Sequence, residues 1–511
     1  MILQNFSEVK PTPALNKLRG EVTEWLTGAL AGYNPVKIRS NKIIRDAIFG
    51  FISTHRHEVN IIDSPILQRL RYIHQNSLAY LTYPSATHTR FEHSLGVMSV
   101  ADNIMQAIIK KHDTSIIQPL EFIETRLAAL LHDCGHGPFS HASEAVYFDM
   151  ATELQSAKNE VPEIFGGAAG HEMLSYLIVT SPTFKTLLWD KVCELYKTEH
   201  GYYHLLKMVS FDRIGQMIVG VPNTPSTKYL TQIINGPFDA DKFDYVIRDG
   251  YFSGLITTLD VDRMSVSIDI DNSNHDGETI ICMDIGGSTT LEQLLFNKML
   301  LFSSMYHHHK VRAAFRQLVA LLNTARTNKI DICGIELASP VSYLQLDDDR
   351  LICDALQKPK LKPLAEAIRN RQLFRRSLVI DNQVLNGPSA RSDWFLLSED
   401  NDEKLETERK IAEIAGVEKE QVCIDFPPNP RINSTAKFSM IRRAPDRPLV
   451  PLDSLYPVSG WLAGYEQFRF RSYILGPEGS QETIANAAKK VLGYIDIDYE
   501  LAGSLAKWPN R

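Results

Sequence analysis

The chain has 511 residues, of which 44% are hydrophobic and 23% charged, proportions typical of a globular protein with a substantial core rather than of a disordered chain. Its formal net charge of −7 argues against indiscriminate binding to nucleic-acid backbones. It has neither an uncharged apolar run of about 18 residues nor the pattern of a secretory signal, so we expect a cytoplasmic protein with no membrane partner.

The cysteines are scattered along the chain without any CxxC pair. This pattern suits a reducing compartment and argues against a structural zinc ribbon. Any metal ion in this protein is therefore expected to be held by histidine and carboxylate side chains. The six cysteines are Cys134, Cys193, Cys282, Cys333, Cys353 and Cys423.

The first two thirds of the chain are dominated by helical periodicity. Residues 1–40 form an N-terminal helical extension with one amphipathic helix, and residues 41–340 form a core with apolar residues three and four apart. Ser64 before Pro65 predicts an N-cap followed by proline in the first helical turn. The predicted core helices cover 64–75, 94–112, 121–133, 171–179 and 291–325, and a small β-hairpin around Asp276-Gly277 is predicted within 266–285.

Residues 341–511 read as a smaller α+β region. Strands are predicted within 375–386, 420–430, 435–444 and 468–476, and they alternate with helices at 404–417 and 480–495. The whole chain is therefore expected to be mainly α, with a helical core, a small β-hairpin and a C-terminal α+β region.

One short stretch, AALLHDCGHGPFSH at residues 128–141, crowds histidines and an aspartate at the end of an apolar helix. His132 and Asp133 end that helix, and His93 lies at the start of another; imidazole and carboxylate together suit a divalent ion. A further carboxylate is needed, and the segment at 239–250 offers Asp239, Asp241, Asp244 and Asp249. We select Asp241, although spacing alone does not identify it. The alternative is a set of buried, hydrogen-bonded polar groups without a metal.

In this order, HTRFEHSLGV, LLHDCGHGPFSHASE, the His171-Glu172 pair and DADKFDYVIRD resemble the HD-domain phosphohydrolases, and more closely the deoxynucleoside triphosphate triphosphohydrolases. The resemblance extends from residue 42 to about 315. It implies a helical HD core in which four side chains bind a divalent ion (Mg, Mn, Fe, Zn or Ni). These are His93, His132, Asp133 and Asp241.

The resemblance implies cleavage between the α-phosphorus and the 5′ oxygen, which releases a nucleoside and inorganic triphosphate. A bound ion polarises the phosphoryl oxygen and activates water, and the leaving alkoxide needs a proton donor such as histidine. His141 and Glu144 lie three apart and share a helical face. The resemblance instead pairs Glu144 with His171 as the leaving-group acid, which leaves His136 and His141 to contact phosphates.

Further residues match family positions that hold the substrate. Arg90 and Lys242 would bind the polyphosphate, and Tyr245 and Asp249 would line the sugar, with Asp249 accepting from the 3′-hydroxyl. Gln75 would lie beside Asp249.

Two positions depart from the family pattern at the sugar. Asn76 stands where the animal members of this triphosphohydrolase family have leucine. His307 stands where they have a tyrosine that stacks on the sugar, and Tyr306 is the adjacent candidate for that position. Both changes replace an apolar or aromatic wall with a hydrogen-bonding one, which can accept a hydroxyl that an apolar wall rejects. The choice between deoxyribose and ribose therefore stays open.

The leading prediction is a metal-dependent nucleoside triphosphate triphosphohydrolase with a nucleoside triphosphate substrate. The resemblance also implies a nucleotide effector and a homo-oligomer of two, four or six subunits; nucleic acid is the less favoured partner. One alternative is an HD phosphodiesterase or nuclease acting on RNA, single-stranded DNA or cyclic nucleotides, because the same metal-assisted attack serves any phosphoester. Another alternative is a nucleotide sensor without turnover.

Overall fold

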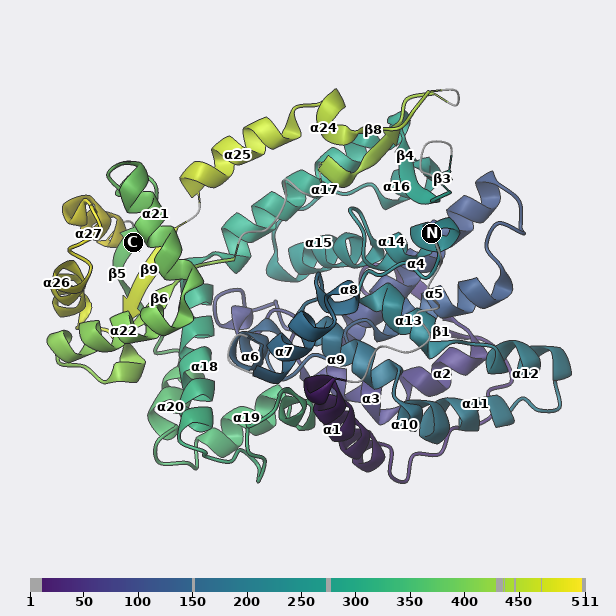
Figure 1. Ribbon diagram of the computed structural model, residues 1–511, viewed down its shortest axis with the longest axis horizontal. Helices are drawn as coiled ribbons and strands as arrows, with labels where there is room; N and C mark the ends of the chain where they lie inside the picture. Colours follow the sequence, from purple (N-terminus) through teal and green to yellow (C-terminus); the bar gives the residue numbers. More distant parts are fainter. Residues whose placement is uncertain are drawn as a thin grey trace.

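The computed structural model describes residues 12–148, 152–272, 277–428, 435, 437–444, 447–469 and 471–507. The predicted mainly α class is confirmed: a large helical core lies at the right of Figure 1, and a smaller α+β unit lies at the left. None of the described helices is both long enough and apolar enough to cross a membrane.

The helical core buries one continuous hydrophobic cluster that runs from Leu15 to the C-terminal region. The predicted helices at 94–112, 121–133 and 171–179 are confirmed as α4, α5 and α9, and the N-terminal helix is confirmed as α1. The core helices are α1 (Pro13–Ala29), α2 (Arg56–Ile62), α3 (Pro65–Gln68), α4 (Arg90–Lys111), α5 (Pro119–Leu131), α6 (His141–Tyr147), α7 (Thr152–Glu160), α8 (Pro162–Phe165), α9 (Gly170–Val179), α10 (Pro182–Phe184), α11 (Asp190–Glu194), α12 (His200–Lys207), α13 (Phe211–Ile218), α14 (Lys228–Ile234), α15 (Ala240–Ser253), α16 (Val261–Ser267), α17 (Ser288–Leu301), α18 (His309–Thr327), α19 (Asp348–Ala355) and α20 (Lys362–Arg369).

Two predicted helices are interrupted. The segment 64–75 forms only α3, followed by a 3₁₀ turn at Arg69–Tyr72. Ser64 is its N-cap residue with Pro65 in the first turn, as predicted, although the Ser64 hydroxyl donates to the Ile61 carbonyl and accepts from no helix amide. The segment 291–325 is divided into α17 and α18 by a π-helical turn at Phe302–Tyr306. A π turn holds one residue more than an α turn, so side chains after it face a different direction.

The small sheets are antiparallel hairpins with one parallel addition. The first hairpin, β1 (Lys42–Asp46) with β2 (Gly50–Thr54), was not predicted. The predicted hairpin is confirmed as β3 (Ile268–Asp271) with β4 (Ile280–Asp284), although Asp276 of its turn lies outside the described residues. Strand β7 (Met440–Arg442) pairs parallel to β4, and β8 (Val450–Pro451) pairs with β7. This sheet therefore joins the chain on both sides of residue 340.

The α+β unit is a three-stranded antiparallel sheet, β5 (Arg375–Ile380), β9 (Ser472–Gly476) and β6 (Cys423–Asp425), with β9 in the centre. The unit has its own buried cluster, and the strands predicted within 375–386, 420–430 and 468–476 and the helices predicted at 404–417 and 480–495 are confirmed there. The strand predicted within 435–444 is β7, which joins β4 and not this sheet. Arg312 of α18 forms a bidentate ion pair with Asp425 of β6 (2.6 and 2.9 Å), which fixes the unit to the core. The helices after residue 380 are α21 (Gly387–Glu399), α22 (Asn401–Ala415), α24 (Leu452–Leu455), α25 (Val458–Arg469), α26 (Gln481–Val491) and α27 (Tyr499–Lys507).

A buried ion pair ties α2 to α5. The Arg126 guanidinium donates to both oxygens of Glu58 (2.7 and 2.8 Å) and also pairs with Asp102 (2.8 Å). Burial raises the pKa of Glu58, but Arg126 outweighs burial and lowers that pKa to about 2. Because α5 ends at the histidine-rich stretch, this pair supports the segment that carries the predicted site.

We predict that Glu58→Gln destabilises the protein at pH 7 by about 3 kcal/mol, because it leaves Arg126 buried with one carboxylate fewer. A carboxyl with a lowered folded-state pKa stabilises the fold above its unfolded pKa, so the difference should shrink as pH falls from about 4.5 towards about 2. Urea unfolding of both proteins at several pH values measures this. A difference that stays constant down to pH 3 would contradict the prediction.

Candidate metal centre and active site

Three helix ends converge on the predicted metal ligands. Helix α4 begins with a capping box at Thr89 and carries His93 in its first turn. Helix α5 ends at Leu131, so His132 and Asp133 follow its last turn. Helix α15 begins after Asp239, whose side chain accepts from the Lys242 amide and thereby fixes the turn that carries Asp241.

The four predicted ligands lie within contact range of one another. His93 Nε2 is 3.1 Å from Asp241 Oδ1 and 3.5 Å from Asp133 Oδ2. His132 Nε2 is 3.4 Å from Asp133 Oδ1 and 3.9 Å from Asp241 Oδ1. Two donors about 2.1 Å from one ion lie about 3.0–3.4 Å apart, so the four side chains need only small shifts to share an ion.

Hydrogen bonds on the far side of each ring direct the same nitrogen, Nε2, towards this centre. His93 Nδ1 bonds to Asp244 (2.7 Å), and His132 Nδ1 bonds to the Ala129 carbonyl (2.8 Å). Both Nε2 atoms are buried and lack a hydrogen-bond partner, which is costly unless a ligand occupies them. Unpartnered imidazole nitrogens beside two carboxylates fit a divalent ion, and bonds to the other nitrogen are how proteins orient such ligands.

A buried chain of ion pairs continues behind His93, and sequence reasoning missed it. Asp244 accepts from Arg248 (2.9 Å), which also donates to Asp46 (2.9 Å). The spacing of Asp244 and Arg248 could have predicted their ion pair, because residues four apart share one helical face. A Cβ at Gly96 would lie 1.8 Å from Asp244 Oδ1. Only glycine there lets α15 approach α4 closely enough for this bond.

The carboxylates determine the protonation of the centre. Burial lowers the pKa of His93, but the neighbouring Asp241 and Asp244 carboxylates outweigh burial and raise it to about 10. Burial raises the pKa of Asp133, but Arg90 and the neighbouring imidazoles hold it well below its usual range. Asp133 therefore stays ionised, and a metal ion would displace the proton held by His93.

Arg90 is buried beneath the centre rather than exposed. Its guanidinium donates to Asp133 Oδ2 (2.6 Å), Ser140 Oγ (2.9 Å) and the Gln75 carbonyl (3.4 Å). The arginine thus links a predicted metal ligand to the turn that follows the histidine-rich helix end.

The remaining histidines form a second group beside Asp133. Glu144 bonds to Nδ1 of His141 (2.7 Å) and to Nδ1 of His171 (3.0 Å). The sequence offered either histidine as its partner, and in the structure it contacts both. The His136 ring stacks on His171 with centroids 4.0 Å apart. His171 Nε2 is 3.9 Å from Asp133 Oδ1, which brings this group to the edge of the metal centre.

The second group contains one charged and one neutral imidazole. Burial lowers the pKa of His171, but Glu144 outweighs burial and raises it to about 9. Burial, Arg90 and His171 lower the pKa of His136 well below its usual value. His171 therefore keeps a proton at neutral pH and can donate it, whereas His136 is neutral.

The turn between these groups is strained. Phe139 and Ser140 have positive φ values of 56° and 54°, a region that costs roughly 1–3 kcal/mol for a residue other than glycine. A Cβ at Gly135 would lie 2.3 Å from the His171 carbonyl. The backbone here packs against α9 and depends on surrounding bonds to keep its shape.

The far end of α15 carries a polar cluster that includes His88, a residue that the sequence analysis did not single out. Asp249 bonds to His88 Nε2 (2.7 Å) and accepts from the Tyr306 hydroxyl. Asn76 Nδ2 lies 3.4 Å from His88 Nε2, and the backbone N–H of the buried Gln75 donates to the His88 carbonyl (3.0 Å).

The structure does not bring His307 to Asp249 by any of the bonds described here. Its Nε2 bonds to the Pro428 carbonyl (3.1 Å), whereas the hydroxyl of the adjacent Tyr306 donates to Asp249. The π turn at Phe302–Tyr306 explains the difference, because its extra residue shifts the facing side chain by one position.

Two other predicted substrate contacts lie on α15. Lys242 donates to Asp239 and to the Gly236 carbonyl (2.8 Å), so its ammonium group is turned towards the start of the helix. Tyr245 is half-buried one turn beyond Asp241. Asp241, Tyr245 and Asp249 therefore follow one helical face from the metal centre to the polar cluster.

The chain matches two family models: the HD domain over residues 90–231 and the HD associated region over residues 259–500. It is 27% identical over 469 residues to an uncharacterized protein of Methanocaldococcus jannaschii, covering 90% of this chain and 85% of that protein. It is 32% identical over 238 residues to the deoxynucleoside triphosphate triphosphohydrolase SAMHD1 of Mus musculus, covering 43% of this chain and 33% of the mouse protein.

A SAMHD1 homolog of Dictyostelium discoideum is 27% identical over 379 residues, covering 71% of this chain and 64% of that protein. The chain thus spans between a third and two thirds of these two triphosphohydrolases. Asp241, Tyr245 and Asp249 lie between the two matched regions.

We predict that His132→Ala and Asp133→Ala each weaken binding of a divalent ion by more than about tenfold, because each removes one of few ligands. Calorimetric titration with Mn²⁺, together with metal analysis of the purified protein, measures this. Asp249→Asn is the control, since it changes an aspartate at the other end of α15 and should bind the ion normally. Loss of the ion in His171→Gln but not in Asp133→Ala would place the ion in the second group instead.

Proposed function

We propose, from the match to the HD domain over residues 90–231, that this centre hydrolyses nucleoside triphosphates to nucleoside and inorganic triphosphate with the aid of a divalent ion. The observation that carries the proposal is the pair of buried, unpartnered Nε2 atoms of His93 and His132 beside two carboxylates. A proton donor, His171, lies 3.9 Å from one of these carboxylates.

Each group has a distinct role in the proposed reaction. A divalent ion held by His93, His132, Asp133 and Asp241 would polarise the α-phosphoryl group and activate water. His171, kept protonated by Glu144, would give its proton to the leaving 5′ oxygen.

The phosphates would be held beside these groups. In this proposal His136 and His141 of the second group contact the phosphates. His136 is buried, and the His141 side chain is 61% exposed. Lys242 would exchange its bond with Asp239 for a phosphate oxygen, and Arg90 would neutralise charge from beneath Asp133.

In this proposal the substrate lies along the face of α15 that carries Asp241, Tyr245 and Asp249. The triphosphate would lie at the Asp241 end, Tyr245 would line the sugar, and Asp249 would accept from the 3′-hydroxyl. Asn76 and Gln75 lie beside His88 in the same cluster. This wall is polar, so we propose that deoxyribonucleotides are substrates without excluding ribonucleotides.

A nucleotide effector is part of the proposal, and a cationic cluster beside α18 is the kind of surface that attracts one. Burial and, after it, nearby arginines lower the pKa of Lys310 to about 8, although Glu478, which pairs with Arg375 (2.9 Å), opposes this. The arginines that act on Lys310 are Arg371, Arg375 and Arg376. Assembly into dimers, tetramers or hexamers is also proposed, by analogy with the family alone.

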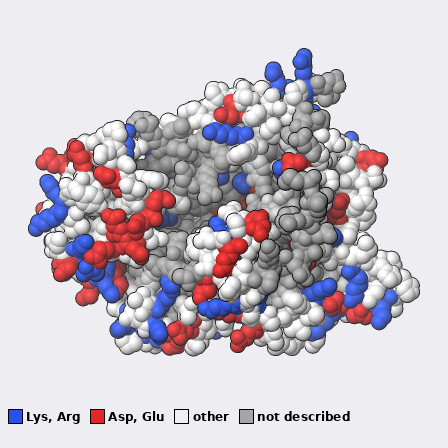
Figure 2. All heavy atoms as spheres, in the orientation of Figure 1, with Lys and Arg blue, Asp and Glu red and all other residues white. Residues whose placement is uncertain are grey.

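The second candidate function is phosphodiester hydrolysis of RNA, single-stranded DNA or cyclic nucleotides. Figure 2 shows basic and acidic side chains interspersed on one face, with acidic atoms gathered over the α+β unit. Arg442, one of the paired arginines in the sequence, forms ion pairs with Asp269 and Asp271. Both observations favour a small nucleotide over a polymer.

The six cysteines are free thiols, which supports the cytoplasm as the location.

We predict that the protein loaded with Mn²⁺ or Mg²⁺ converts deoxynucleoside triphosphates to nucleoside and triphosphate. Ion-exchange chromatography resolves these products when the four deoxy- and four ribonucleotides are supplied singly and in mixtures, and a need for mixtures would reveal an effector. The double variant His132→Ala, Asp133→Ala should produce neither product. Release of pyrophosphate or single phosphates would contradict the proposed site of cleavage. Nucleotide binding without any product would favour the sensor.

We predict that His171→Gln and Glu144→Gln lower kcat by about 10²–10⁴, because they remove the proton donor or the carboxylate that keeps it charged. His141→Gln should mainly raise KM, since His141 contacts phosphate in this proposal. Steady-state kinetics measure both effects, with metal analysis to verify that the ion is retained. His204→Gln, on the exposed face of α12, is the control. Equal losses of kcat in His141→Gln and His171→Gln would contradict the assignment of roles.

A further inference from the structure

A buried carboxylate outside the matched HD domain contacts the strained turn of the site. Asp348, the first residue of α19, accepts from the backbone amide of Phe139 through Oδ1 (2.5 Å). Through Oδ2 it accepts from the backbone amide of His74 (2.9 Å) and bonds to His74 Nδ1 (2.7 Å). One side chain thus joins two loops of the core that are distant in sequence.

These bonds lead directly to the metal centre. The Ser140 hydroxyl donates to the His74 carbonyl (2.7 Å) and accepts from Arg90 Nε (2.9 Å), and Arg90 also holds Asp133 (2.6 Å). A change at Asp348 would therefore reach Asp133 through one turn and one guanidinium group.

The turn needs an external restraint. Phe139 and Ser140 both have positive φ, a conformation that persists only where the surrounding structure holds it. Asp348 bonds the amide of the first of these residues. From the other side, Arg69 donates to the carbonyls of Cys134 (3.0 Å) and His136 (2.5 Å).

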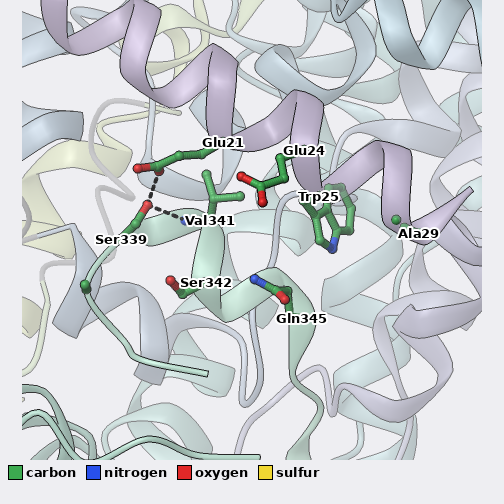
Figure 3. A pocket seen from close by; sticks show the side chains of 10 residues that line it. Glu21, Glu24, Trp25, Ala29, Ser339, Val341, Ser342 and Gln345 are labelled. Atoms are coloured by element: carbon green, nitrogen blue, oxygen red, sulfur yellow. Dashed lines mark hydrogen bonds between the residues drawn. The ribbon is translucent and has the colours of Figure 1, made fainter. Parts of the chain in front are cut away.

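The segment that precedes α19 has an inner face on this turn and an outer face on a cavity. On the inner face, the Tyr343 ring lies 5.2 Å from the Tyr147 ring, and a Cβ at Gly137 would lie 3.0 Å from Tyr343 Cβ. On the outer face, Ser342 and Gln345 line a cavity of about 690 Å³ against α1 (Figure 3). Residues of one short segment can therefore be changed on either face.

We propose that Asp348 is a positioning residue: it holds the Phe139–Ser140 turn so that Arg90 and Asp133 keep the geometry needed for hydrolysis. The inference rests on the proposed function, and it gives the HD associated region a direct part in the site. Asparagine cannot replace Asp348 fully, because the two backbone donors bond to different oxygens. In either orientation, an amide group would face one of these donors.

The test compares Asp348→Asn with Asp349→Asn, which removes the same charge from an exposed neighbouring side chain. Gln345→Ala, on the cavity face, is a second control. We expect Asp348→Asn to lower kcat by about tenfold to hundredfold with less than a threefold change in KM, whereas both controls behave like the original protein. Hydrogen exchange should also accelerate at the Phe139 amide in Asp348→Asn alone.

The outcomes separate the inference from the proposed function. If the original protein hydrolyses no nucleotide, the proposed function fails, and exchange at Phe139 still decides whether Asp348 restrains the turn. If Asp348→Asn has a lower Tm but unchanged kcat and exchange well below that Tm, its role is only structural and the inference is overturned. If Asp348→Asn does not fold, His74→Gln removes only the imidazole bond and should lower kcat partially; an unchanged kcat there overturns the inference.

Discussion

The burial of one carboxylate, Asp133, is the constraint on which the site depends. Withdrawing a carboxylate from water costs several kcal/mol unless cations and donors surround it, and here Arg90 and the imidazoles do so. Its Oδ1 lies 3.4 Å from His132 and His136 and 3.9 Å from His171. One buried charge therefore lies beside both the proposed metal ligands and the proposed proton donor, His171, so the two histidine groups adjoin.

Helices with strong apolar periodicity, and the order of the histidine and aspartate motifs, were predictable from the sequence. The supporting partners were less so. The ion pair of Asp244 and Arg248 is the exception, because their spacing of four residues places them on one helical face. Asp348 and His88 gave no local signal, because their partners lie 209 and 161 residues away in sequence. Contacts of that separation depend on how helices pack, which periodicity does not encode.

The predicted boundary at residue 340 illustrates the same limit. Composition changes there, and the α+β unit does have its own core. Yet β7 pairs with β4, Arg312 pairs with Asp425, and Asp348 reaches the turn at Phe139. The C-terminal third is thus part of the structure that holds the site. A pattern of strands indicates that a sheet forms but not which distant strand it joins.

The π turn between α17 and α18 gives the site an unusual sensitivity to chain length. Each residue of a helix turns the next side chain by about 100°, and this turn presents the Tyr306 phenol to Asp249 while the His307 imidazole faces Pro428. Loss of a single residue from the turn would rotate the following side chains, so that the imidazole and not the phenol would face Asp249, without any substitution. If this cluster binds the sugar as we propose, a change of one residue in the length of the turn would alter that wall as strongly as a substitution does.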